Sequence, residues 1–169
     1  MFLKIIKEVK KKMRKKMFII LLVMMIIFAL ASSLYAQETD PAKVVTAMAD
    51  ALNAGDVEAT MVLFTDDAII KVLYGDARPP SSTIGREQVR AFMEKIVAGN
   101  FKIQVEILQV LGDIAVTRTK TWMDKTIQLG IAPLDYIEIY IIQDGKIKGF
   151  VDILTDESVA KMKDALAPK

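Results

Sequence analysis

YIEIYIIQDGKIKGFVD, residues 136–152, decides the fold of this chain. Aromatic and β-branched residues stand on both sides of Asp144-Gly145, a dipeptide that tolerates the positive φ angles of two-residue turns between antiparallel strands. The stretch therefore predicts a hairpin, with strands over 135–143 and 146–154. Gly112-Asp113 predicts a second hairpin upstream, with strands over 101–111 and 114–123.

Helical signals flank these hairpins. Asp40-Pro41 reads as an N-cap followed by the first helical residue, and apolar residues then recur at helical spacing as far as Gly55. The sequence predicts two further helices before the hairpins, one helix after them, one short strand and one loop. In chain order they are a helix from Asp56, a strand from Ala68 to Tyr74, a loop from Gly75 to Thr83, a helix from Arg86 to Ala98 and, after the hairpins, a helix from Thr155/Asp156.

The order of these elements predicts the fold class. Three helices, a bent antiparallel sheet and a short C-terminal helix make an α+β domain in which the N-terminal helices pack on one face of the sheet. The prolines in the GDARPPSST loop (75–83) argue against regular strand pairing there.

The N-terminal segment predicts export. Residues 4–16 hold eight Lys or Arg and one acid, and Met17–Ala31 is an unbroken run of fifteen apolar residues. This pattern is typical of a secretory signal peptide. We therefore expect a signal peptide over 1–36, a domain over 37–169, and a periplasmic or extracellular location. The alternative is an uncleaved anchor, which would be the only part of the chain in contact with a membrane.

Composition excludes several classes of function. The whole chain has 23 basic and 21 acidic residues. Residues 1–36 hold 8 basic residues and 1 acidic residue, so residues 37–169 hold 15 basic and 20 acidic residues, a net charge of −5. A mildly acidic domain argues against nucleic acid as a partner. Without His or Cys, the chain has no imidazole base, histidine metal ligand or disulfide. No cofactor and no metal site are predicted.

Hairpin register sorts the upstream strands into faces. A two-residue turn at Gly112-Asp113 pairs Ile107 with Arg118, and cross-strand partners share a face. Arg118, Lys120 and Trp122 are thereby expected on the core face, among apolar residues. The intervening threonines are expected to face water: Thr117, Thr119 and Thr121.

Four segments resemble the nuclear transport factor 2-like superfamily, which includes ketosteroid isomerases and polyketide cyclases. They are ALNAGDVEATMVLFTDDAII (51–70), IGREQVRAFMEKI (84–96), LGD (111–113) and the hairpin at 136–152. The resemblance implies a cone of helices and bent sheet with an interior pocket, dimerisation through the sheet, and a buried acidic residue at the position of Glu138. Register alone does not choose between the faces of this hairpin.

These expectations define a candidate site and a leading function. A carboxylate inside an apolar pocket needs a partner, and Arg118 and Lys120 are the expected ones. We expect the cone to bind a small apolar molecule with a polar or anionic end, without evident catalysis. The predicted ligand-binding residues are Arg118, Lys120, Trp122, Tyr136, Glu138 and Tyr140.

Two alternatives remain open. The first is a hydrolase, isomerase or cyclase that uses Glu138 as acid or base. Steroid isomerase chemistry is disfavoured, because two of the three residues carried over from that family fall on Met48 and Val72. His-dependent cyclase chemistry lacks its His, and Lys120 stands where the middle acid of an epoxide hydrolase trio is expected. The second alternative is a dimeric scaffold that works through the sheet face of Ile137, Ile139 and Ile141.

Overall fold

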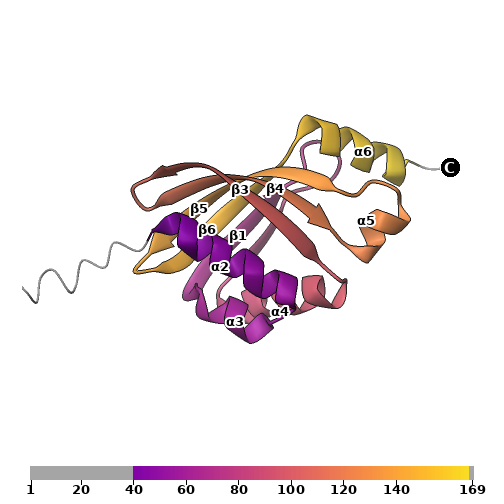
Figure 1. Ribbon diagram of the computed structural model, residues 1–169. Coiled ribbons are helices and arrows are strands. Elements are labelled where there is room, and N and C mark those ends of the chain that lie inside the picture. Colours follow the sequence, from indigo (N-terminus) through magenta and orange to yellow (C-terminus); the bar gives the residue numbers. More distant parts are fainter. Residues whose placement is uncertain (1–39, 168–169) are drawn as a thin grey trace, which may run out of the picture. The chain divides into compact units, whose positions relative to one another are not determined.

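The computed structural model describes residues 40–167, which form five helices and one six-stranded sheet (Figure 1). The helices are α2 (Pro41–Ala54), α3 (Val57–Val62), α4 (Arg86–Ala98), α5 (Asp124–Gln128) and α6 (Asp156–Leu166). The strands are β1 (Phe64–Leu73), β2 (Ser81–Ile84), β3 (Lys102–Leu111), β4 (Ile114–Trp122), β5 (Leu134–Gln143) and β6 (Lys146–Leu154). The predicted α+β class is confirmed.

The signal peptide predicted over 1–36 lies outside the described residues. Among residues 40–167, no helix combines the length and the apolar character that a bilayer crossing requires.

The sheet is curved and has the strand order β2-β1-β6-β5-β4-β3. Neighbouring strands are antiparallel, except that β1 and β6 run parallel. Helices α2, α3 and α4 lie on one side of the sheet, here called the inner face, while α6 lies near the start of β5 on the other side (Figure 1). The sheet and the inner helices together form the wall of the cone.

Local sequence explains where the helices begin and end. The Asp40 side chain accepts a hydrogen bond from the Ala42 N–H at 3.0 Å, and Gly55 ends α2 with φ +73°. The predicted stripe on α2 is buried against the sheet, which supplies most of the stability of such a helix. Helix α6 is capped by Thr155, as expected.

The structure differs from the predicted elements at three points. Strand β1 begins at Phe64 rather than at Ala68, and β2 pairs with it inside the segment predicted to be a loop. The prolines do not prevent this pairing because they precede Ser81, the first residue of β2. The segment after β4, where no helix is predicted, forms the short helix α5.

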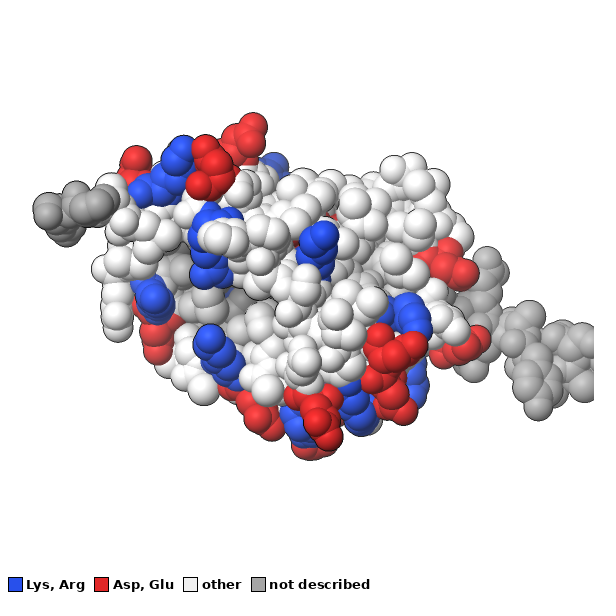
Figure 2. All heavy atoms as spheres, turned by 180° about the vertical axis from the view of Figure 1, so that it is seen from behind, with Lys and Arg blue, Asp and Glu red and all other residues white. Residues whose placement is uncertain are grey.

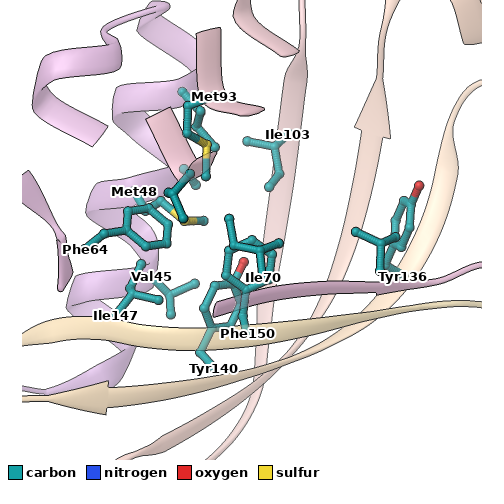
Figure 3. Packing of buried hydrophobic residues seen from close by; sticks show 14 of the residues in the cluster. Val45, Met48, Phe64, Ile70, Met93, Ile103, Tyr136, Tyr140, Ile147 and Phe150 are labelled. Atoms are coloured by element: carbon teal, nitrogen blue, oxygen red, sulfur yellow. The ribbon is translucent and has the colours of Figure 1, made fainter. Parts of the chain in front are cut away.

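The core lies between the inner face and α2, α3 and α4. Phe150 stacks at a tilt on Tyr140, with 5.0 Å between ring centroids, and lies 6.2 Å from Phe64. Figure 3 shows the ring of Phe64 beside Met48 from α2. Asn53 links α2 to the edge strand β3 by two hydrogen bonds. Its side-chain amide donates to the Ile103 carbonyl at 2.8 Å, and its side-chain oxygen accepts from the Ile103 N–H at 2.9 Å.

Candidate functional site

A β-bulge in β3 determines which side chains of β4 enter the cone. The strands pair as predicted next to the turn, but Leu108 is an extra residue, so Ile107 pairs with Thr117 and not with Arg118. A one-residue slip moves every following side chain to the opposite face. Thr117, Thr119 and Thr121 are therefore buried on the inner face, and the prediction that they face water is wrong.

The same bulge places the expected cations outside. Arg118 and Lys120 are exposed on the outer face, where they line a shallow hollow of about 130 Å³ with Gln104 and Glu106. Arg118 Nε lies 3.6 Å from Oδ1 of Asp135, which is also on this face. The predicted cluster of Glu138 with Arg118 and Lys120 is wrong, because the sheet separates the carboxylate from both cations.

Strand alternation also places Trp122 with the outer residues. It is half-buried at the end of β4, where it pairs with Lys102 of β3. Of the predicted ligand-binding residues, the structure brings three together on the inner face: Tyr136, Glu138 and Tyr140. Their role in binding stays a prediction.

A second bulge, in β6, brings another carboxyl group to Glu138. Lys148 is the extra residue in this hairpin, so Glu138 lies directly opposite Asp152 instead of Val151. Asp152 therefore joins Glu138 on the inner face. An unbroken two-residue hairpin would put Asp152 on the outer face of the sheet, so the sequence pattern did not identify this residue.

Glu138 is surrounded by hydroxyl groups. Its side chain is buried, and Oε2 accepts hydrogen bonds from the Tyr140 hydroxyl at 2.6 Å and from Thr119 at 2.7 Å, with Thr117 more distant at 3.3 Å. The threonine hydroxyls lie 3.1 Å apart and can bond each other. All of these donors converge on one oxygen, which favours the ionised carboxylate.

Asp152 has a different environment. Its Oδ1 is enclosed and has no hydrogen-bond partner among the described residues. Burial raises the pKa of Asp152 well above its usual range, and the neighbouring charge of Glu138 raises that pKa further. Burial also raises the pKa of Glu138, but its hydroxyl donors oppose the rise. We infer that the pair holds one proton, on Asp152, because only Glu138 has donors that stabilise a charge.

Two tyrosines complete the inner row of β5. Tyr140 is fully buried between Glu138 and Phe150, and burial raises its pKa, as it does for Tyr136. Both phenols are therefore neutral hydroxyl groups at physiological pH. Figure 3 shows Tyr136 further along the strand, apart from the labelled core residues around Ile70.

A cation that the sequence did not single out lies at the end of β1. The Arg78 guanidinium stacks on the ring of Tyr74, 3.4 Å from its centroid. Tyr74 continues the buried row of β1 that includes Ile70 and Val72. Arg78 lies in the segment predicted to be a loop, and only the position of Tyr74 in three dimensions identifies its partner.

The comparisons with known proteins agree with this architecture. A SnoaL-like domain model matches residues 45–150, which is more than half of the chain. This chain belongs to the SnoaL-like family. The predicted resemblance to nuclear transport factor 2-like proteins is thereby confirmed. No curated protein shows significant sequence similarity to the chain.

Many solved structures share the fold of this SnoaL-like domain. An NTF2-like protein of unknown function from Cytophaga hutchinsonii has a TM-score of 0.56 at 16% identity, over 71% of this chain and 94% of that one. SalBIII, an epoxide hydrolase/cyclase-like enzyme of pyran ring formation in salinomycin, has a TM-score of 0.58 at 18% identity, over 72% and 95%. An LEH-like epoxide hydrolase from M. tuberculosis has a TM-score of 0.54 at 16% identity, over 77% and 91%. At such identities the likeness shows the fold alone.

The interior of this SnoaL-like domain has a defined chemical capacity. Asp152 offers a proton and an unused acceptor, while Glu138 offers a carboxylate whose Oε1 receives none of the hydroxyl bonds that converge on Oε2. Within residues 40–167, no three acidic side chains come together as metal ligands. The pair can thus hydrogen-bond a neutral polar group, and it can give and take one proton.

Proposed function

We propose that this SnoaL-like domain binds a small, mostly apolar molecule in the interior of its cone, with a neutral hydrogen-bond donor of that molecule facing Asp152 and Glu138. The supporting observation is the enclosed Oδ1 of Asp152, which lacks a partner among the described residues. Buried polar atoms in folded proteins are nearly always hydrogen-bonded, so an unused acceptor favours a ligand donor at this point. The predicted anionic end of the ligand was expected to meet Arg118 and Lys120, but these two cations lie on the outer face and not beside Asp152 and Glu138.

Isoleucine methyl groups offer a direct test of binding. Ile70 and Ile103 are buried on the inner face, whereas Ile139 and Ile141 lie on the outer face. We expect the neutral fluorophore N-phenyl-1-naphthylamine to shift the inner methyl resonances of ¹³C-labelled protein and to leave the outer ones in place. Shifts confined to the outer methyls would show that the probe coats the sheet, and would contradict binding in the cone.

A second candidate function is acid–base catalysis on the bound molecule. The opposite environments of Asp152 and Glu138 favour it, because an acid and a base with separated proton affinities are what such chemistry requires. In a hydration of an epoxide, Glu138 would take a proton from water while Asp152 gives one to the oxygen of the opening ring. Water adds across one C–O bond, a diol leaves, and a proton returns from Glu138 to Asp152.

Substitution within the pair separates catalysis from binding. We expect Glu138→Gln and Asp152→Asn each to abolish turnover of small apolar epoxides while the fluorophore still binds. The matched control is Glu106→Gln, which removes a carboxylate from the outer face of the same sheet. Turnover that survives in both inner variants would remove the catalytic candidate and leave the binding function in place.

The outer face motivates a proposal about partners. Isoleucines of β5 and β6 are exposed there, among them Ile141 at 49% and Ile153 at 37%. Glu106 lies beside Arg118 and Lys120 at one end of this face, so two identical faces that meet across a two-fold axis can pair unlike charges. We propose a homodimer through this face. Sedimentation of a monomer at micromolar concentration would contradict it, as would an unchanged dimer in Ile139→Lys.

The N-terminal segment supports a proposal about location. Its basic flank, apolar run and small residues favour export, with cleavage after Ala36. The mass of the protein recovered outside the cytoplasm tests this, since cleavage there leaves a chain beginning at Gln37. A full-length chain recovered from membranes would support the anchored alternative.

A further inference from the structure

The loop between β1 and β2 holds its residues in fixed positions. Gly75 has φ +58°, and a Cβ at this residue would lie 2.9 Å from a methyl group of Val159 in α6. Lys163 of α6 also donates to Asp76 at 2.7 Å. The loop is therefore attached to α6 at its first two residues, next to Arg78.

Arg78 is oriented by an aromatic ring that belongs to the cone wall. Tyr74, on which the guanidinium stacks, is only 7% exposed, and its hydroxyl lies 3.3 Å from the Ser81 hydroxyl. Burial raises the pKa of the Tyr136 phenol, and Arg78 opposes that rise, so the guanidinium lies within electrostatic reach of Tyr136. Arg78, which is itself exposed, thus covers Tyr74 at the end of the buried row of β1.

Stacking leaves the hydrogen-bonding edges of the guanidinium unused. A planar guanidinium that covers a ring with its face still presents its N–H groups in the plane, in the fork that matches a carboxylate or sulfonate. Among the described residues, no carboxylate forms an ion pair with Arg78. The arginine is therefore positioned for an anion and lacks one in this part of the chain.

The surface in Figure 2 fits an opening for such a molecule. Charged side chains gather along the upper and lower margins of this view, whereas its middle is mostly uncharged and hollowed, with single basic side chains around the hollow. An amphiphile that enters by such a surface keeps its charge among cations at the rim while its apolar body is removed from water.

We propose that Arg78 binds the anionic group of the ligand, and that the ligand is an apolar molecule with a single negative charge at the end remote from Glu138 and Asp152. This inference rests on the proposed function, since it concerns the same interior. The carboxyl pair fixes the orientation, because the charge of Glu138 repels an anion at the inner end. The neutral hydrogen-bond donor of the ligand therefore lies at the inner end, beside the carboxyl pair, and its anionic group stays with Arg78.

Two fluorophores that differ in one charge test the proposal on the full-length protein. 1-Anilinonaphthalene-8-sulfonate carries a sulfonate that N-phenyl-1-naphthylamine lacks. In Arg78→Gln we expect the Kd of the sulfonate to rise about tenfold or more, the effect of losing a charged hydrogen bond, while the Kd of the neutral probe stays within a factor of about two. Arg78→Lys restores only part of the affinity, because an ammonium group does not offer the stacked fork.

Controls separate the possible failures. Arg118→Gln removes a cation from the outer face and leaves both Kd values unchanged if the probes are in the cone. Equal weakening of both probes in Arg78→Gln makes Arg78 a packing residue, and an unchanged sulfonate Kd removes its role altogether; either result overturns this inference alone. If neither probe shifts the inner methyl resonances of Ile70 and Ile103, the proposed function falls as well.

Discussion

Replacement of Asp152 by Asn is expected to change how stability depends on pH. Burial and the charge of Glu138 raise the pKa of Asp152 in the folded chain, whereas in the unfolded chain it returns to about 4. Between these two values, the folded chain keeps a proton that the unfolded chain has released. The free energy of unfolding therefore falls as pH rises through this window, and the loss is complete only above the folded pKa.

The size of the effect follows from the number of protons. One proton of difference between the folded and unfolded chains changes the free energy of unfolding by about 1.4 kcal/mol per pH unit. From pH 4.5 to 6.0 the wild type should lose about 2 kcal/mol relative to Asp152→Asn, whose amide does not titrate. The difference in free energy of unfolding between the two proteins should accordingly shift by this amount in favour of the variant over that range.

Urea denaturation at several pH values measures this slope. The free energy of unfolding is extrapolated to water at each pH, and the two slopes are subtracted. Glu58→Gln is the control: its hydrogen bond to Arg90 lowers the pKa of Glu58, so that carboxylate contributes stability above its usual pKa and loses it only in more acidic solution. Parallel slopes for the wild type and Asp152→Asn from pH 4.5 to 6.0 would refute the reasoning.

Three further experiments test the arrangement around the pair. Thr119→Val removes the 2.7 Å hydrogen bond to Glu138 and should cost about 1–3 kcal/mol in urea denaturation, whereas Thr121→Val, on the same face without a bond to that carboxylate, should cost less. Because the chain has no cysteine, a thiol reagent should label Arg118→Cys at least about a hundredfold faster than Thr119→Cys, and equal rates would contradict the observed faces. Gly149→Ala places a methyl carbon 2.6 Å from a backbone oxygen of β1, and thermal unfolding should show a loss of about 1–3 kcal/mol or more.

Much of the fold was predictable because turns and helix caps are local signals. Asp144-Gly145 and Gly112-Asp113 fix the positions of both hairpins, and Asp40 and Gly55 bound α2. Strand β2 was not predictable in this way. Its four residues are exposed or half-buried, so they show no apolar alternation. They form a strand because β1 lies beside them, and a local sequence pattern does not indicate such a neighbour.

The candidate site was predictable only in part, because bulges depend on the partner strand. The sequence identified Glu138, Tyr136 and Tyr140, but the assumption of unbroken pairing reversed the faces of β4. A signal was present nonetheless. Burying Arg118 and Lys120 is far more costly than burying threonine hydroxyls that can bond to a neighbour, so the balance of burial energies already favoured a slip.

The carboxyl pair exists because the chain departs from regular pairing at one point of β6. Lys148 is the extra residue there, and the next residue, Gly149, approaches β1 so closely that a Cβ would collide with the Ile69 carbonyl oxygen. From Gly149 onward, β6 pairs in register with β1 on one side and β5 on the other, and this register turns Asp152 inward. Without the extra residue, Asp152 would share the outer face with Ile137, and Glu138 would face only hydrocarbon and hydroxyl groups. The second carboxyl group of the site therefore depends on a glycine that pairs with Ile141 on the outer face, and Gly149→Ala should weaken the pH slope of Asp152 as well as the fold.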